Sequence, residues 1–165
     1  MILTRHAKSS WDNPLLDDID RSLNTRGQRD SDRVGHWLSA KGYRPAQAVV
    51  SAARRTQETW SRIQDAALLG GTECSLHEGL YLASSDRILQ QLHGARGQTV
   101  ILIAHNPGIG DFAARFAATP PAHADFARYP TCATTVFDVA ADSWSQVRFG
   151  ENTVLDFCIP RDLTD

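Results

Sequence analysis

The sequence predicts an α/β fold: a single three-layer α/β/α domain whose central sheet is mostly parallel and carries helices on both faces. Short apolar runs alternate with amphipathic stretches along most of the 165 residues. This alternation is typical of parallel sheets. The length suits one domain, so we expect residues 1–165 to form a single unit. With 42% hydrophobic and 22% charged residues, the composition is that of a globular protein.

The strands are expected where short apolar runs lie between turn-forming residues. The clearest run, residues 99–104, is preceded by Gly97 and followed by His105-Asn106-Pro107-Gly108. Similar runs predict strands at residues 1–4, 46–50 and 74–76. Near the end of the chain, residues 132–139 and 144–149 are expected to pair as antiparallel strands, and residues 153–159 to add an edge strand.

The helices are expected where apolar residues recur at helical spacing. Asn24 is suited to cap a helix over residues 25–40, and Gly42 to end it. Further helices are predicted over residues 56–69, from Ser84 or Ser85 to residue 92, and over residues 109–118. Polar and proline-containing stretches predict loops at residues 9–21 and 119–130.

Charge and cysteine content exclude several classes of protein. A net charge of -2 removes the usual electrostatic argument for binding nucleic acid or an anionic membrane. The longest apolar run, residues 99–104, is too short to span a bilayer, and the first residues lack a signal-peptide pattern. The chain has an odd number of cysteines, and their spacing is not that of metal ligands: Cys74, Cys132 and Cys158. We therefore expect no metal, no cofactor and no disulfide scaffold, and a cytoplasmic location.

Polar residues follow the expected strands at the point where each strand ends. Ligands of open α/β sheets bind beyond the carboxyl ends of the strands, so these residues are expected to converge on one edge. They are Arg5-His6, Ser51-Ala52-Ala53-Arg54-Arg55, His77-Glu78 and His105-Asn106.

This combination of residues predicts a phosphoryl site. Arginine binds phosphate oxygens through its planar fork and stays charged at any working pH. A helix beginning near Pro107-Gly108 would add backbone N–H donors for an anion. A histidine beside two arginines would stay neutral and could attack phosphorus, and a second histidine could donate a hydrogen bond to the phosphoryl oxygens.

Four ordered motifs resemble those of the histidine phosphatase superfamily, which contains the phosphoglycerate mutases. Arg5-His6-Ala7-Lys8-Ser9-Ser10-Trp11 is similar to the N-terminal motif of its small phosphohistidine phosphatase branch, the SixA-like proteins. The other similar segments are Arg21-Ser22-Leu23-Asn24-Thr25-Arg26-Gly27, Ser51-Ala52-Ala53-Arg54-Arg55-Thr56-Gln57-Glu58-Thr59 and His105-Asn106-Pro107, with Tyr129-Pro130-Thr131 as a later element. The resemblance implies a phosphoglycerate mutase-like fold without a cap insertion.

The resemblance also implies a role for each matched position. His6 would be the nucleophile that becomes phosphorylated, Arg5 and Arg54 would clamp the phosphoryl group, and His105 would complete the pocket. Arg54 matches the family position better than Arg55 does. Glu78 is the candidate proton donor, with a surface carboxylate as the alternative.

Three further residues are candidates for binding substrate. Arg21 would reach the substrate or pair with a nearby aspartate. Ser9 would contact phosphate or belong to a polar turn. Asn106 follows the second histidine directly and is expected beside the bound group.

The function that the resemblance implies is a metal-independent phosphohydrolase that removes phosphate from phosphohistidine on a protein. The alternative within the superfamily is a phosphatase for a small phosphoester, such as a sugar or nucleoside phosphate. A non-catalytic phosphate-binding module is a third possibility, and a metal-dependent hydrolase using His6, His77 or His105 as ligands is a fourth. The presence of all four matched residues argues against the third: Arg5, His6, Arg54 and His105. The absence of His-x-x-x-His or clustered-carboxylate spacing argues against the fourth.

Overall fold

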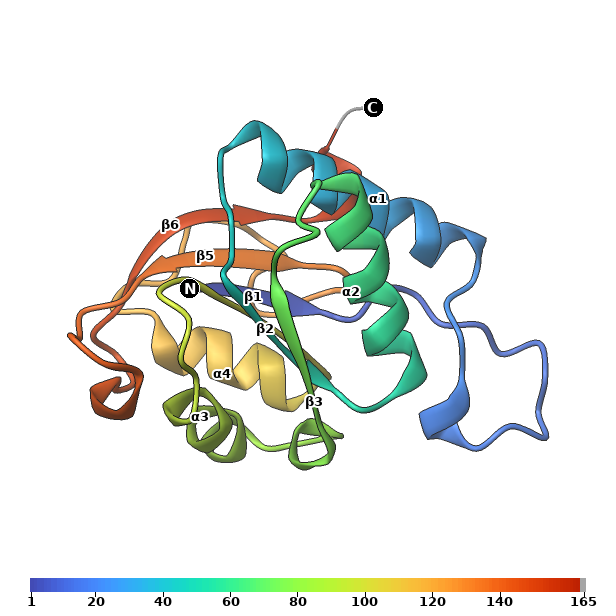
Figure 1. Cartoon of the computed structure of the whole chain (residues 1–165), viewed down its shortest axis with the longest axis horizontal. Helices are drawn as coiled ribbons and strands as arrows, with labels where there is room; N and C mark the ends of the chain where they lie inside the picture. The colour runs from blue at the N-terminus through green and yellow to red at the C-terminus, as the bar shows by residue number, and fades with distance from the viewer. Residues whose placement is uncertain (164–165) are drawn as a thin grey trace.

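A computed structural model describes residues 1–163 of the chain, and its centre is a six-stranded sheet (Figure 1). The order of the strands across the sheet is β3-β2-β4-β1-β5-β6. Strands β3, β2, β4 and β1 are parallel, and β5 and β6 run antiparallel to their neighbours. The bounds are β1 (Ile2–Arg5), β2 (Gln47–Ser51), β3 (Glu73–His77), β4 (Val100–Ala104), β5 (Thr134–Asp138) and β6 (Thr153–Cys158).

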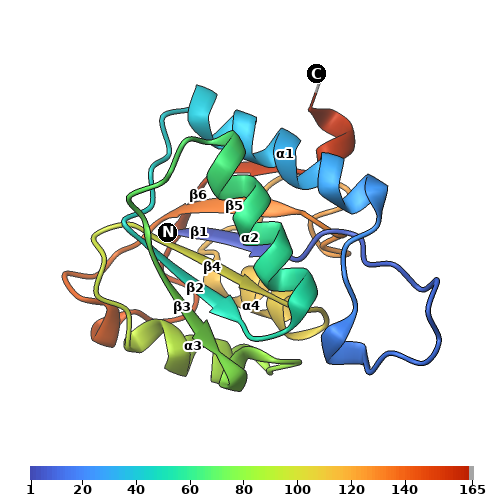
Figure 2. The same ribbon diagram turned by 45° about the vertical axis from the view of Figure 1, so that its right-hand side comes forward.

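Two helices cover each face of the sheet, which confirms the expected three layers (Figures 1 and 2). One face carries α1 (Thr25–Ala40) and α2 (Arg54–Ala66), and the other carries α3 (Ser85–His93) and α4 (Gly108–Phe116). Alternate residues of each central strand point to opposite faces. In β4, Ile101 and Ile103 therefore pack with α1 and α2, while Leu102 packs with α3 and α4.

Helices α1 and α3 begin at the polar caps that the sequence predicts. The Asn24 side chain accepts a hydrogen bond from the Gly27 amide at 2.8 Å, so α1 starts as expected. Ser84 caps α3 in the same way. Helix α2 begins at Arg54, two residues earlier than predicted, which places Arg54 and Arg55 in its first turn. No helix among residues 1–163 has the length and apolar character needed to cross a bilayer.

The prediction of a strand at residues 144–149 is wrong. Trp144–Gln146 forms a single 3-10 turn, and β5 pairs with β1 on one side and β6 on the other. Both edges of β5 are therefore occupied. The Trp144 indole donates a hydrogen bond to the Gly97 carbonyl at 2.6 Å. Trp144 therefore packs against the segment that precedes β4 and does not pair as part of a strand.

The pairing of β1 with β4 positions the candidate site. Arg5 lies opposite Ala104 in this parallel pair. The residues that follow, His6 and His105, therefore leave the sheet side by side. The His6 amide donates to the Ala104 carbonyl at 3.1 Å, which continues the pairing one step beyond the strands.

Candidate active site

A cavity of about 410 Å³ lies at the carboxyl ends of β1 and β4. Arg5 and His6 enter it from β1, His105 and Asn106 from β4, and Arg55 from the first turn of α2. Other lining residues come from three loops: Lys8, Ser9, Trp11, Asp18, Leu82 and Thr131. The position agrees with the rule for ligand sites in open α/β sheets.

His6 is held as a neutral imidazole with one nitrogen available. Its Nδ1 lies 2.8 Å from the Ala7 carbonyl oxygen. A carbonyl only accepts, so Nδ1 carries the proton and Nε2 carries the lone pair. Burial lowers the pKa of His6 to about 4, and the charges of Arg55 and Arg5 act in the same direction. The imidazole is therefore unprotonated at neutral pH and nucleophilic at Nε2.

His105 lies beside His6, with their ring centroids 5.1 Å apart. Its Nδ1 is 3.2 Å from Nη2 of Arg55, which can only donate, and its Nε2 is 2.7 Å from the Ser51 hydroxyl. The neutral ring therefore accepts from Arg55 and donates to Ser51. Burial lowers the pKa of His105 to about 3, with His6 and Arg55 contributing. In this arrangement His105 orients Arg55, and its single N–H is directed to Ser51 rather than into the cavity.

Two guanidinium groups, those of Arg5 and Arg55, add positive charge to the cavity beside that of Lys8. Arg5 donates through Nη1 to the Tyr129 carbonyl at 2.9 Å, and its buried Nε has no hydrogen-bond partner among residues 1–163. Burial lowers the pKa of Arg5, and the charge of Arg55 lowers it further. Asp18 offsets part of this charge by accepting from Arg55 at 2.9 Å. A bound phosphoryl group would relieve the remaining repulsion between the two arginines.

Arg55, not Arg54, occupies the cavity, so the expected position of Arg54 is wrong. Arg55 is 4% exposed, whereas the Arg54 side chain is 57% exposed and pairs with Glu58 at 2.7 Å. The reason is the helical period of α2. Residue 55 lies on the same face as Thr59 and Ile63, which are buried against the sheet. Residue 54 lies on the exposed face of α2. The four-residue spacing of positions 55, 59 and 63 can be read in the sequence, so it could have indicated Arg55 as the buried arginine.

Glu78 lies at the start of η2 (Glu78–Leu80), where it is exposed and does not line the cavity. The carboxylate that lines it is Asp18, which the sequence reasoning did not single out. Asp18 also accepts a hydrogen bond from the Tyr81 hydroxyl at 2.7 Å. Partial burial raises the pKa of Asp18, but Tyr81 and Arg55 outweigh it and lower the pKa below its ordinary value.

Arg21 is buried outside the cavity lining. Its Nη2 donates to the Ser10 carbonyl, and its guanidinium carbon lies 3.0 Å from the centre of the Trp11 ring. These contacts support the structural alternative for Arg21, although its partners differ from the aspartates expected.

Ser9 and Asn106 both line the cavity, as expected of substrate-binding candidates. Ser9 also pairs with Leu23 in an isolated antiparallel bridge, so it belongs to the turn as well. Asn106 donates to the carbonyls of Arg128 and Tyr129, and its buried Oδ1 finds no hydrogen-bond partner in the part of the chain that the structure describes. Asn106 and Arg5 thus both donate to the Tyr129 carbonyl, and these hydrogen bonds connect the segment around Tyr129 to the site.

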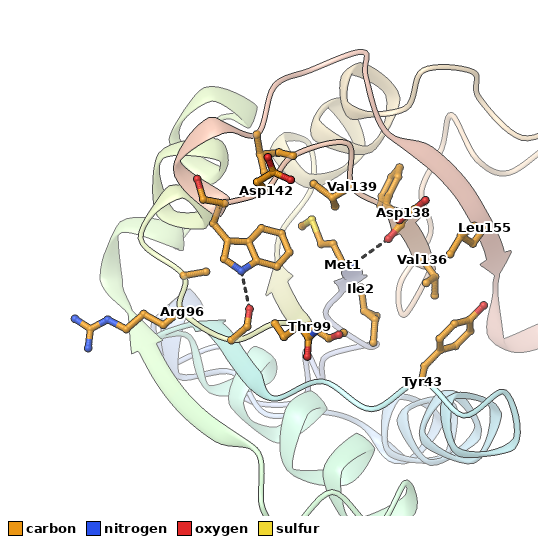
Figure 3. Close-up of a pocket in the computed structure, with 18 of the residues that line it drawn as sticks. Met1, Ile2, Tyr43, Arg96, Thr99, Val136, Asp138, Val139, Asp142 and Leu155 are labelled. Atoms are coloured by element: carbon orange, nitrogen blue, oxygen red, sulfur yellow. Dashed lines mark hydrogen bonds between the residues drawn. The ribbon is translucent and has the colours of Figure 1, made fainter.

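A second cavity, of about 840 Å³, lies at the opposite end of the sheet (Figure 3). Its lining includes Met1, Tyr43, Arg96 and Trp144. None of the expected site residues lines it, so its size does not make it the catalytic site. Among residues 1–163, no group of three or more His, Cys, Asp or Glu side chains is placed to hold a metal ion.

Sequence comparison finds a matching family model and a plant relative. Residues 1–81 match the model of the histidine phosphatase superfamily, branch 1. An uncharacterized chloroplastic protein of Arabidopsis thaliana is 27% identical over 157 residues, which cover 88% of this chain and 69% of the relative.

Solved structures of SixA proteins have the same fold. A candidate phosphohistidine phosphatase SixA from Agrobacterium tumefaciens has a TM-score of 0.78 and 25% identity, covering 96% of each chain. The protein histidine phosphatase SixA complexed with tungstate has a TM-score of 0.77 and 21% identity, covering 99% of this chain and 98% of that one.

Proposed function

Because the chain belongs to the histidine phosphatase superfamily, we propose that it is a phosphohydrolase that forms a covalent phosphohistidine intermediate on His6. We further propose that its substrate is phosphohistidine carried on a protein. The observation that carries this proposal is a buried, neutral His6 beside two guanidinium groups in one cavity. Free Nε2 supplies the nucleophile, and Arg5 and Arg55 supply charge for the transferred phosphoryl group.

The reaction has two steps that use the same groups. In the first, Nε2 of His6 forms a bond to phosphorus while the phosphorus–nitrogen bond of the substrate breaks in line, and the released imidazole takes a proton from solvent. In the second, water attacks the phosphohistidine, giving inorganic phosphate and restoring neutral His6. Arg5 and Arg55 stabilise the charge on the phosphoryl oxygens in both steps.

The ionised state of Asp18 favours phosphohistidine over an alkyl phosphate as substrate. Asp18 is the carboxylate among the residues that line the cavity, and its lowered pKa keeps it deprotonated at neutral pH. It is therefore suited to accept a proton from the attacking water rather than to donate one. An alkoxide needs a proton to leave, whereas imidazole is a good leaving group, so a site without a ready acid suits phosphohistidine.

A phosphoryl label tests the nucleophile directly. The enzyme is mixed with a phosphohistidine peptide labelled at phosphorus and quenched. We expect an acid-labile, base-stable label on the protein, which is lost in His6→Ala. The matched control is His36→Ala, because His36 is exposed on α1, and it should label normally. A label that persists in His6→Ala would contradict the assignment.

Substrate profiling tests the substrate class and the independence from metal. We expect the phosphohistidine peptide to be hydrolysed faster than sugar or nucleoside phosphates, and the rate to be unchanged by EDTA. Faster hydrolysis of a small phosphoester would favour the alternative substrate.

The cytoplasmic location stays a prediction. It is supported by the three cysteines, Cys74, Cys132 and Cys158, which are free thiols.

A further inference from the structure

Large apolar side chains are exposed at the active-site cavity and on the loop that follows Trp11. Trp11 and Leu82 both line the cavity and are 71% and 56% exposed. Leu15 and Leu16, four and five residues beyond Trp11, are 91% and 42% exposed. We refer to these four residues as the rim. Such a group of exposed apolar residues beside a reactive site is typical of an interaction surface.

The chain segment that carries most of the rim projects from the body of the protein. Residues 11–20 extend beyond the carboxyl end of β1 as a blue loop on the right of Figures 1 and 2. The loop is anchored at its base by the Asp18–Arg55 pair and by the hydrogen bond from Arg21 to Ser10. At its tip, the Asn13 side chain accepts from the Leu15 amide at 3.0 Å, which holds the turn but does not cover Leu15.

The charge of this loop is opposite to that of the cavity. Residues 11–20 contain four aspartates, at positions 12, 17, 18 and 20, and no lysine or arginine. All four aspartates are exposed. The cavity behind them presents Arg5, Arg55 and Lys8. A phosphate dianion alone gains nothing from an acidic loop. A partner with basic residues around its phosphoryl group is attracted both by the aspartates of the loop and by the positive charges of the cavity.

We propose that residues 11–20 and Leu82 form the docking surface for the protein that carries the phosphohistidine. The partner's histidine is flanked by apolar side chains, which pack on the rim, and by basic side chains, which face the aspartates of the loop. This inference rests on the proposed function. It adds that the enzyme selects its substrate by the surroundings of the phosphohistidine as well as by the phosphoryl group.

Two synthetic peptides and one small substrate serve as probes. Both peptides carry a central phosphohistidine, one flanked by Leu and Lys and the other by Gly and Ser, and phosphoramidate has no flanking residues. We expect the wild-type kcat/KM to be highest for the Leu–Lys peptide. Raising the salt concentration should reduce this advantage, because salt screens exposed charges.

Two rim variants have matched controls elsewhere on the surface. Leu15→Ser is compared with Leu155→Ser, because Leu155 is exposed on β6. Leu82→Gly is compared with Leu68→Gly, because both leucines are exposed and have positive φ angles of 48° and 55°. Leu68 follows the far end of α2, roughly 20 Å along the helix from Arg54.

The measured quantity is the ratio of kcat/KM for the Leu–Lys peptide to kcat/KM for phosphoramidate. Each rim variant should lower this ratio by up to about tenfold, as expected for the loss of one buried leucine contact. Leu155→Ser and Leu68→Gly should leave it unchanged. Equal effects of rim and control variants, or equal wild-type rates on the two peptides, would overturn the docking surface alone. If the wild-type protein hydrolyses none of the three substrates, both the docking surface and the proposed function are wrong.

Discussion

At the scale of single residues, Arg54 and Arg55 have opposite environments although they are adjacent in α2. Arg55 contacts His105 and Asp18, while Arg54 forms an ion pair with Glu58 on the exposed side. Successive residues of a helix are separated by about 100° around its axis. One position along the chain therefore decides whether a guanidinium group reaches the cavity.

Substitution of each arginine separates these two roles. Arg55→Ala should lower kcat/KM by about a hundredfold or more, because the proposed function assigns Arg55 a charge-assisted contact to the phosphoryl group and because Asp18 loses its ion-pair partner. Arg54→Ala should change kcat/KM by less than about fivefold, since exposed ion pairs contribute little. The measurement is steady-state hydrolysis of the phosphohistidine peptide. A larger loss in Arg54→Ala than in Arg55→Ala would return the role to Arg54.

At the scale of elements, two glycines allow backbone segments to meet beside the site. A Cβ placed at Gly108 would collide with the carbonyl oxygen of Ala83, so α4 begins in direct contact with the segment before α3. A Cβ at Gly27 would likewise collide with the Lys8 carbonyl oxygen. These contacts hold the start of α4 against the segment that carries Leu82, and α1 against the loop after β1, and both of these segments carry cavity residues.

Gly108→Ala should destabilise the protein by about 2–3 kcal/mol, because the new methyl group meets backbone that can move only with its helix. The matched control is Gly70→Ala, since no described residue other than its chain neighbours lies within 4 Å of a Cβ at Gly70. Thermal unfolding of both variants checks this expectation. A fall in Tm for Gly70→Ala equal to that for Gly108→Ala would show that the contact with Ala83 is not the cause.

At the scale of the whole molecule, the site couples the stability of the fold to pH. His6 is 8% exposed and His105 is 1% exposed, and both are held neutral. An unfolded chain exposes both rings to water, where each takes up a proton near its ordinary pKa of 6.5. Lowering the pH therefore favours the unfolded state.

The free energy of unfolding should fall as the pH is lowered from 6.5 towards the folded-state pKa of about 4 for His6. The lowered pKa of this one residue corresponds to a loss of up to about 3 kcal/mol. His6→Gln should lose less stability than wild type between pH 7 and pH 4, as should His105→Gln. In urea unfolding at these two pH values, His36→Gln should behave as wild type because His36 is exposed. An unchanged loss in His6→Gln would contradict the burial argument.

The central part of the fold could be predicted because its signals are local. The cap at Asn24 and the apolar run in β4 each lie within a few residues, and both were found where expected. The convergence of His6 and His105 followed from one general rule about parallel sheets. Trp144 was misassigned because its partner, the Gly97 carbonyl, is 47 residues away along the chain.

By itself, the sequence determined the layered α/β fold and the two histidines and Arg5 at the ends of neighbouring strands. Only the tertiary structure decided which remaining charges join them. Asp18 enters from a loop with no periodic pattern, and Glu78 stays outside because the turn after β3 leaves it exposed. Periodicity reports which face of an element is buried, but the approach of a loop to a site depends on long-range contacts such as those of Asp18 with Arg55 and Tyr81.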